Sequence, residues 1–159
     1  MASPRWLTDE EQILWRLILN SIRHLERGME DTLQQESGIG ASEFAVLVSL
    51  SEAEDCGMRL RDLCQLLEWD RSRASHQITR MERRGLVLKH KCSDDARGVL
   101  VTITDDGLRR LEAAAPGHVE SVRRLVFDQL TGEEVDFLRT LLERLVTPPP
   151  EPTGCKTED

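Results

Sequence analysis

The feature that most constrains the fold is a pair of short runs with β-strand character inside a sequence of helical periodicity. The runs LVLKHKC (residues 86–92) and GVLVTIT (residues 98–104) alternate in polarity or are rich in β-branched residues, and the turn-rich SDDARG lies between them. This pattern is typical of two antiparallel strands joined by a short connection. We therefore predict one β-hairpin over residues 86–104, with helices on both sides of it.

The segments before the hairpin have the apolar spacing of helices. A long first helix begins near Thr8, which forms a capping box with Glu11, and ends at Gly38 and Gly40. Two shorter helices are predicted over residues 42–55 and 61–69, separated by a break with a strand residue or two. In the first helix the apolar residues that recur at helical spacing are Leu14, Ile18, Ile22, Leu25 and Met29. The expected inward-facing residues are Phe44, Leu47, Val48 and Ser51 in the second helix, and Leu60, Leu63, Leu66 and Leu67 in the third.

A fourth helix is predicted between Asp70, a favourable N-cap, and Gly85, a favourable residue just past a helix end. Its apolar stripe is narrow and consists of Ala74, Ile78 and Met81. The opposite face carries Ser72, Ser75, His76, Thr79 and Arg83, flanked by Arg73 and Arg80. Two consecutive helices joined by a tight turn and followed by a hairpin make a winged helix-turn-helix. The predicted fold class is therefore mainly α, with a small β-hairpin as the wing.

The chain after the hairpin is predicted to be helical up to a polar tail. Thr104 caps the next helix, in which Pro116-Gly117 must cause a kink or a break. Thr131 and Glu134 form a second capping box at the start of the last helix. Residues 147–159 are Pro-rich and polar, so we expect a disordered tail.

Positive charge is concentrated in one segment of an otherwise acidic chain. The formal net charge is −8, yet residues 71–91 carry seven Lys or Arg against the single acid Glu82. That segment has a net charge of +6, which leaves −14 for the rest of the chain. A basic helix face next to a wing is the electrostatic pattern expected for contact with duplex DNA.

Other classes of protein have no support in the sequence. The chain contains no P-loop, no Gly-x-Ser-x-Gly, no His-Glu-x-x-His and no dinucleotide fingerprint, so we expect neither an enzyme nor a cofactor. The histidines are not paired at helical spacing, and Cys and His do not cluster, so no metal site is expected. With no long apolar run and no secretory signal, a cytoplasmic protein with reduced thiols is expected.

The segment LCQLLEWDRSRASHQITRMERRGLVLKHKCSDDARGVLVTITDDG resembles the core of the MarR family of bacterial transcriptional regulators. MERRGLV is similar to the family's exit from the recognition helix, the helix that enters the major groove. DDARGVLVTIT is similar to its wing, with Asp-x-Arg followed by an apolar strand and Thr. The order of helices over residues 8–146 also agrees. The resemblance implies sequence-specific binding of double-stranded DNA, with repression as the default mode.

The resemblance assigns roles to individual residues. Arg97 matches the wing arginine that enters the minor groove, and Asp95 matches the acid that orients the wing, with Arg80 or Arg84 as its partner; Asp95 as a simple turn residue is the alternative. The recognition-helix candidates, in which Arg73 pairs with guanine and His76 and Gln77 reach base edges, are Ser72, Arg73, Ser75, His76, Gln77, Thr79 and Arg80. The phosphate candidates are Arg59, Arg83, Arg84, Lys89 and Lys91.

The resemblance also implies a homodimer that reads a pseudo-palindromic site. The first and last helices carry more apolar surface than a small core can cover, which independently supports pairing between copies. We expect residues 1–37 and 105–146 to form the dimerisation region and residues 38–104 the DNA-binding lobe. A small-molecule effector is implied by the resemblance, but no residue identifies it. Two alternatives stay open: redox control through Cys92, and a winged helix that binds protein instead of DNA.

Overall fold

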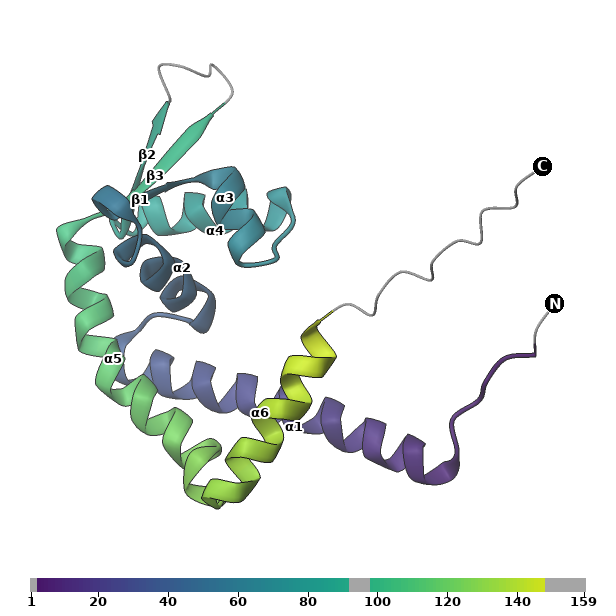
Figure 1. The fold of residues 1–159 in the computed structure, drawn as a ribbon. Coiled ribbons are helices and arrows are strands. Elements are labelled where there is room, and N and C mark those ends of the chain that lie inside the picture. The colour runs from purple at the N-terminus through teal and green to yellow at the C-terminus, as the bar shows by residue number, and fades with distance from the viewer. Residues whose placement is uncertain (1–2, 92–97, 148–159) are drawn as a thin grey trace, which may run out of the picture. The chain divides into compact units, whose positions relative to one another are not determined.

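The computed structural model describes residues 3–91 and 98–147, and the chain divides into two compact units, residues 1–122 and 123–159. The first unit contains the long helix α1 (Asp9–Ser37), a helical lobe and most of α5 (Figure 1). The helices of the lobe are α2 (Ala41–Ser51), α3 (Leu60–Leu66) and α4 (Arg71–Arg83). Its strands are β1 (Gly57–Arg59), β2 (Val87–Lys91) and β3 (Val99–Ile103). Helix α5 spans Asp105–Leu125.

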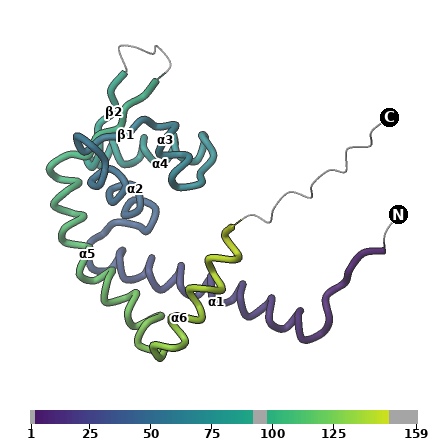
Figure 2. Tube along the Cα trace, viewed as in Figure 1, coloured from purple at the N-terminus to yellow at the C-terminus, as the bar shows by residue number. Residues whose placement is uncertain are grey.

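Helix α1 has the boundaries that its sequence predicts. The Thr8 hydroxyl accepts a hydrogen bond from the Glu11 N–H at 3.2 Å, and the Glu11 carboxylate accepts one from the Thr8 N–H at 2.8 Å. At the other end Gly38 adopts φ +64°, a left-handed conformation that glycine reaches without a steric penalty. The chain then turns directly into α2, as the trace in Figure 2 shows.

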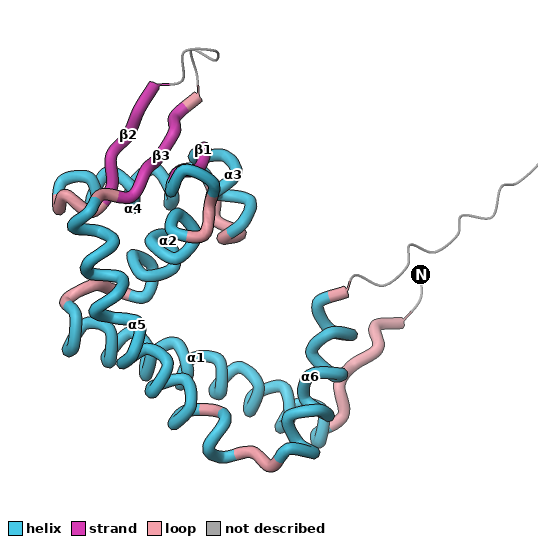
Figure 3. The backbone as a smooth tube through the Cα atoms, turned by 60° about the vertical axis from the view of Figure 1, so that its left-hand side comes forward, coloured by secondary structure: helices cyan, strands magenta, loops and turns pink. Residues whose placement is uncertain are grey.

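The predicted hairpin is confirmed, and it belongs to a three-stranded antiparallel sheet. The strand order is β1-β3-β2, so β3 lies in the middle (Figure 3). Val87 pairs with Ile103 and Lys91 with Val99 across the hairpin, while Met58 pairs with Val101 on the other side of β3. The short break before the third helix thus supplies the third strand. Arg59 ends β1 and is also the N-cap of α3.

The core of the lobe is built where the helices meet the sheet. Val46, Leu47 and Leu50 of α2 are fully buried, and the apolar stripe of α4 is buried as predicted. The C-terminal end of α1 and the start of α5 close this core through Leu33 and Leu111. The remaining members are Ile39, Leu63, Leu86, Val87, Val101 and Ala114.

Two of the predicted helix details are wrong. The second helix ends at Ser51, because the chain then enters a 3-10 turn (Glu54–Cys56) in which Asp55 and Cys56 have positive φ. Leu66 is 57% exposed rather than inward-facing, since α3 ends at this residue. Phe44 and Val48 are partly buried and pack against the core, and Ser51 is half-buried.

Helix α5 runs through Pro116 without a break. A proline removes only its own N–H donor and disturbs one preceding carbonyl, so the turns on either side keep their hydrogen bonds. A Cβ at Gly117 would lie 1.6 Å from a Glu36 carboxylate oxygen, the far end of a flexible side chain of α1, so this side chain would have to move aside. Near this point the Thr32 hydroxyl of α1 donates a hydrogen bond of 3.2 Å to the Ser121 hydroxyl of α5.

The second unit contains a 3-10 turn (Phe127–Gln129) and α6 (Gly132–Val146). The capping box predicted for Thr131 and Glu134 is confirmed, with the Glu134 N–H donating to the Thr131 hydroxyl at 3.3 Å. Among the apolar side chains of α6, Phe137, Leu145 and Val146 are each at least 68% exposed. None of the described helices combines the length and the apolar character that a membrane crossing needs.

Candidate nucleic-acid interface

Helix α4 has one face in the core and one face in solvent. The Asp70 carboxylate caps its start by accepting a hydrogen bond of 2.9 Å from the Arg73 N–H. Ser72, Ser75 and His76 are exposed in its first two turns, and Thr79 is half-buried. Gly85, at φ +75°, ends the helix and leads into β2. The helix therefore presents hydroxyl and imidazole groups, which hydrogen-bond readily to bases and phosphates.

The turn between α3 and α4 is tight and well bonded. The Trp69 N–H donates to the Cys64 carbonyl at 2.9 Å, and Glu68 adopts φ +53° within the turn. The half-buried Trp69 side chain packs against the core. Above its ring lies the Arg73 guanidinium, 4.6 Å from the ring centroid, a cation–π geometry. Arg73, the predicted guanine reader, is thus held at the edge of α4 by an aromatic side chain.

Gln77, which the sequence predicts to reach a base edge, is buried in the structure. Only 7% of Gln77 is exposed, because position 77 lies next to the apolar stripe on the helix surface. Its Oε1 accepts a hydrogen bond from Nη2 of Arg80, and its Nε2 is buried with no partner among the described residues. The side chain is therefore turned into the lobe and away from the exposed face, where a base edge would lie, while Arg80 stays exposed.

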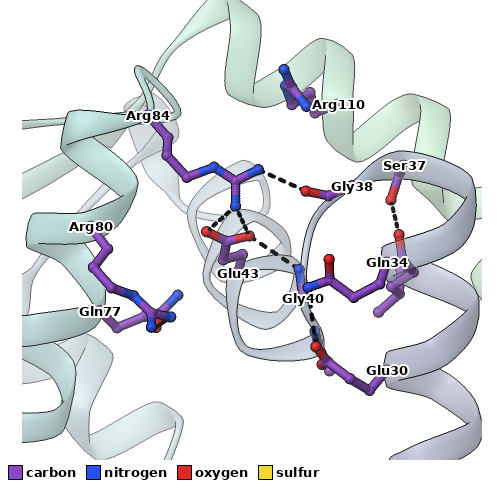
Figure 4. Close-up of polar contacts among 12 residues, drawn as sticks. Glu30, Gln34, Ser37, Gly38, Gly40, Glu43, Gln77, Arg80, Arg84 and Arg110 are labelled. Carbon is purple, nitrogen blue, oxygen red and sulfur yellow. Dashed lines mark hydrogen bonds and ion pairs between the residues drawn. The ribbon is translucent and has the colours of Figure 1, made fainter.

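Arg84 also lies in a different environment from the one predicted. Its Nη1 donates to both carboxylate oxygens of Glu43, at 2.7 and 2.6 Å, and its Nη2 donates to the Gly38 carbonyl at 2.7 Å (Figure 4). The Glu43 side chain is only 6% exposed. Because a buried carboxylate needs a paired cation, the Arg84 guanidinium is occupied by Glu43 and the Gly38 carbonyl in this structure. Glu43 has no predicted role from the sequence, although its position three residues after the N-cap Gly40 is that of a capping-box acid.

The other basic candidates lie at the end of α4 and along the sheet. Arg83 and Lys91 are exposed, and Arg59 is half-buried at the end of β1. Lys89 lies on β2, and its Nζ is 2.8 Å from a Glu82 carboxylate oxygen and 3.3 Å from the Thr79 hydroxyl. The hydrogen bond from Lys89 lowers the pKa of the Glu82 carboxyl below its usual value. The charge of Lys89 is thus partly compensated within the lobe.

Asp95 and Arg97, the predicted wing residues, and Cys92, the predicted redox candidate, lie outside the described residues. Within residues 3–91 and 98–147, no cluster of three or more His, Cys, Asp or Glu side chains is arranged to hold a metal ion.

A tight two-helix turn with an exposed polar second helix, followed directly by an antiparallel hairpin, defines a winged helix-turn-helix DNA-binding protein. The MarR family model matches residues 39–99, which cover this arrangement from the start of α2 to the start of β3. AbsC, a MarR family transcriptional regulator from Streptomyces coelicolor, is 40% identical, with a TM-score of 0.82 over 89% of this chain and 95% of its own.

Further relatives agree with this match. Sco3205, a MarR family transcriptional regulator from Streptomyces coelicolor solved in complex with DNA, is 36% identical, with a TM-score of 0.85 over 91% of both chains. The transcriptional repressor YetL of Bacillus subtilis is 26% identical over 68% of this chain, and the match spans 66% of that protein. The chain belongs to the MarR family, and it is a DNA-binding transcriptional regulator rather than an enzyme.

Replacement of Glu82 by Gln is expected to strengthen binding to DNA. The substitution removes the carboxylate that compensates Lys89, so the ammonium becomes available for a phosphate. The slope of log K against log salt should then steepen by up to about one unit. Fluorescence anisotropy with duplex DNA across a salt series measures both quantities. Glu112→Gln, the same charge change at an exposed position of α5, is the matched control. An equal effect of the two substitutions would mean that net charge alone is responsible.

Proposed function

We propose that the protein is a cytoplasmic repressor that binds a pseudo-palindromic operator as a homodimer. The observation that carries the proposal is the apolar surface of α1 and of the segment before it. From Trp6 to Ile22 this part of the chain leaves eight large apolar side chains between 40% and 84% exposed. Apolar surface of this extent on one element is typical of an interface with another protein. A second copy is the partner that fits a DNA-binding lobe with a single recognition helix.

The homodimer gives the candidate residues their arrangement on DNA. In a two-fold symmetric pair, two copies of α4 enter successive major grooves about 34–36 Å apart. Ser72, Ser75 and His76 then face the base edges, and Arg73 and Arg80 approach from the edge of α4. Arg83 and Lys91 are placed for phosphates, and Arg97 is proposed for the minor groove. Residues 1–37 and 105–146 form the dimerisation region in this proposal, and control by a small molecule stays a prediction of the family resemblance.

Selection of bound duplexes from a random pool tests this proposal directly. We expect enriched sequences with two inverted half-sites whose centres are one helical turn apart. Sedimentation of the free protein should give twice the mass of one chain. Enrichment of single half-sites by a monomer would contradict the homodimer. Binding that is insensitive to salt would instead favour a winged helix that contacts protein.

Replacement of Arg73 by Ala is expected to cost about 1–3 kcal/mol of operator binding and to relax the base preference at one position of each half-site. The reason is that Arg73 lies at the N-terminal end of α4, within reach of a guanine edge once it leaves the Trp69 ring. Competition between specific and random duplexes measures the change. Arg109→Ala, at an exposed arginine of α5, is the control for lost charge. Equal losses on both duplexes would assign Arg73 to a phosphate.

A further inference from the structure

The end of the recognition helix is the point where the two long helices of the first unit meet the DNA-binding lobe. Arg84, the C-cap residue of α4, reaches the last turn of α1 through the Gly38 carbonyl. The next two residues of the chain are held by α5, because the Thr104 hydroxyl donates to the Gly85 carbonyl at 2.6 Å and the Thr104 N–H donates to the Leu86 carbonyl at 3.1 Å. Arg84 thus donates to the C-cap residue of α1, and the next two residues accept hydrogen bonds from Thr104, the residue directly before α5.

The contact with α1 is built as a chain of bonds in which each group has a partner. A Glu30 carboxylate oxygen of α1 accepts from the Ala41 N–H at 2.6 Å, and its other oxygen accepts from the Gln34 amide. Glu43 accepts from the Gly40 N–H at 3.1 Å and from Arg84. The short segment between α1 and α2 is therefore bonded to α1 on one side and to α4 on the other (Figure 4).

The chemistry of Arg84 suits a joint between two helices. Its planar guanidinium offers one nitrogen to the buried Glu43 carboxylate and a second nitrogen to the Gly38 carbonyl, so both contacts are made by one rigid group. The left-handed turn at Gly38 directs that carbonyl toward α4. A change in the position of α1 relative to α4 must therefore break a charge-assisted hydrogen bond.

We infer that Arg84 and Glu43 are positioning residues that couple α1 to the recognition helix and thereby set the half-site spacing that the protein accepts. This inference rests on the proposed homodimer, in which α1 belongs to the shared interface. The orientation of α4 relative to that interface then decides where the two recognition helices meet DNA. Arg84 acts through α4 and does not itself contact a base.

The test compares duplexes that differ only in half-site spacing. Each duplex carries the selected half-sites at their native spacing or with one base pair inserted at the centre, which rotates one half-site by about 34° relative to the other. The wild-type protein should bind the inserted duplex about tenfold more weakly or worse, a loss similar to that from a mismatch in the site. Arg84→Lys keeps the positive charge beside Glu43 but loses the planar guanidinium that makes both contacts. The ratio of the affinities for the native and the inserted duplex, which we call the spacing ratio, should therefore fall below about threefold.

Controls separate positioning from stability. A single half-site should bind wild type and Arg84→Lys with affinities within about twofold of each other. Arg109→Lys, the same change at an exposed arginine of α5 with no assigned DNA contact, should keep the wild-type spacing ratio. Glu43→Gln removes the negative charge that pairs with Arg84 but keeps the shape of the side chain. It should lower the spacing ratio as Arg84→Lys does. Thermal unfolding confirms that each variant is folded in the assay.

The outcomes distinguish the inference from the function on which it rests. If wild type discriminates between spacings and both variants discriminate equally well, the coupling role is overturned while the homodimer stands. The same holds if the variants weaken binding to both duplexes by one factor, as a loss of stability alone would. If the wild-type protein is a monomer with no spacing preference, the proposed homodimer and the coupling role are both wrong.

Discussion

Replacement of Leu14 and Ile18 by Asp is expected to convert the dimer to a monomer and to weaken operator binding at least about 100-fold. Both side chains are exposed on one face of α1, at 58% and 40%. Two carboxylates in an apolar interface would be desolvated without partners, and their ionised forms are strongly unfavourable there. The operator affinity falls because the second half-site is no longer bound as part of the same molecule. Analytical ultracentrifugation and anisotropy measure the two effects.

The matched control places aspartates at the same spacing on another face of the same helix. Arg16→Asp with Asn20→Asp changes exposed polar positions of α1, so the dimer should persist. The double aspartate variant at positions 14 and 18 should keep the helical circular dichroism of wild type, because neither residue belongs to the buried core. A folded dimer with aspartates at 14 and 18 would show that this face of α1 is not the interface.

Replacement of Gly107 by Ala is expected to lower the free energy of unfolding by about 2–3 kcal/mol, the upper part of the range for overpacked sites. A Cβ at this position would lie 2.2 Å from the Leu86 carbonyl oxygen and 3.0 Å from Cγ1 of Ile103. The carbonyl cannot move away easily, since it accepts the hydrogen bond of the Thr104 N–H at 3.1 Å. Urea denaturation followed by circular dichroism gives the change in unfolding free energy.

Gly132→Ala is the comparison for the Gly107 substitution. Gly132 also lies in the first turn of a helix, but a Cβ there meets no atom within 4 Å. Its unfolding free energy should stay unchanged or rise by up to about 1 kcal/mol, because alanine loses less backbone entropy on folding. Similar destabilisation of both variants would mean that the contact with Leu86 is not the cause.

Much of the fold could be predicted because its signals are local. The capping residues Thr8, Asp70 and Thr131 each mark a helix start within a few residues of chain, and the structure places all three as predicted. The hairpin is marked in the sequence by two alternating or β-branched runs with the turn-rich letters SDDARG between them, and the two strands pair as predicted. The end of α2 was misplaced because the segment SEAED contains no Gly or Pro, so periodicity alone did not locate the 3-10 turn that follows Ser51.

The candidate site was harder to predict because its details depend on contacts between distant segments. Arg84 is a basic residue at the end of the recognition helix, as expected of a phosphate ligand. Only the packing of α2 shows that Glu43 lies beside it. Gln77 is polar, yet the angle of its position around α4 places it at the edge of the core. The close approach of Gly107 to Leu86 joins residues 21 positions apart, and no local pattern indicates it.

The shared residue between β1 and α3 has a mechanical consequence for the wing. Arg59 ends the strand that flanks β3 and caps the helix that begins the helix-turn-helix, so no loop separates the two elements. We therefore expect the base of the hairpin and α3 to move together when the lobe binds DNA. If they do, a mismatch in groove width or curvature has to be taken up by the duplex, and we expect sequences that deform at low energetic cost to be preferred at positions that no side chain touches.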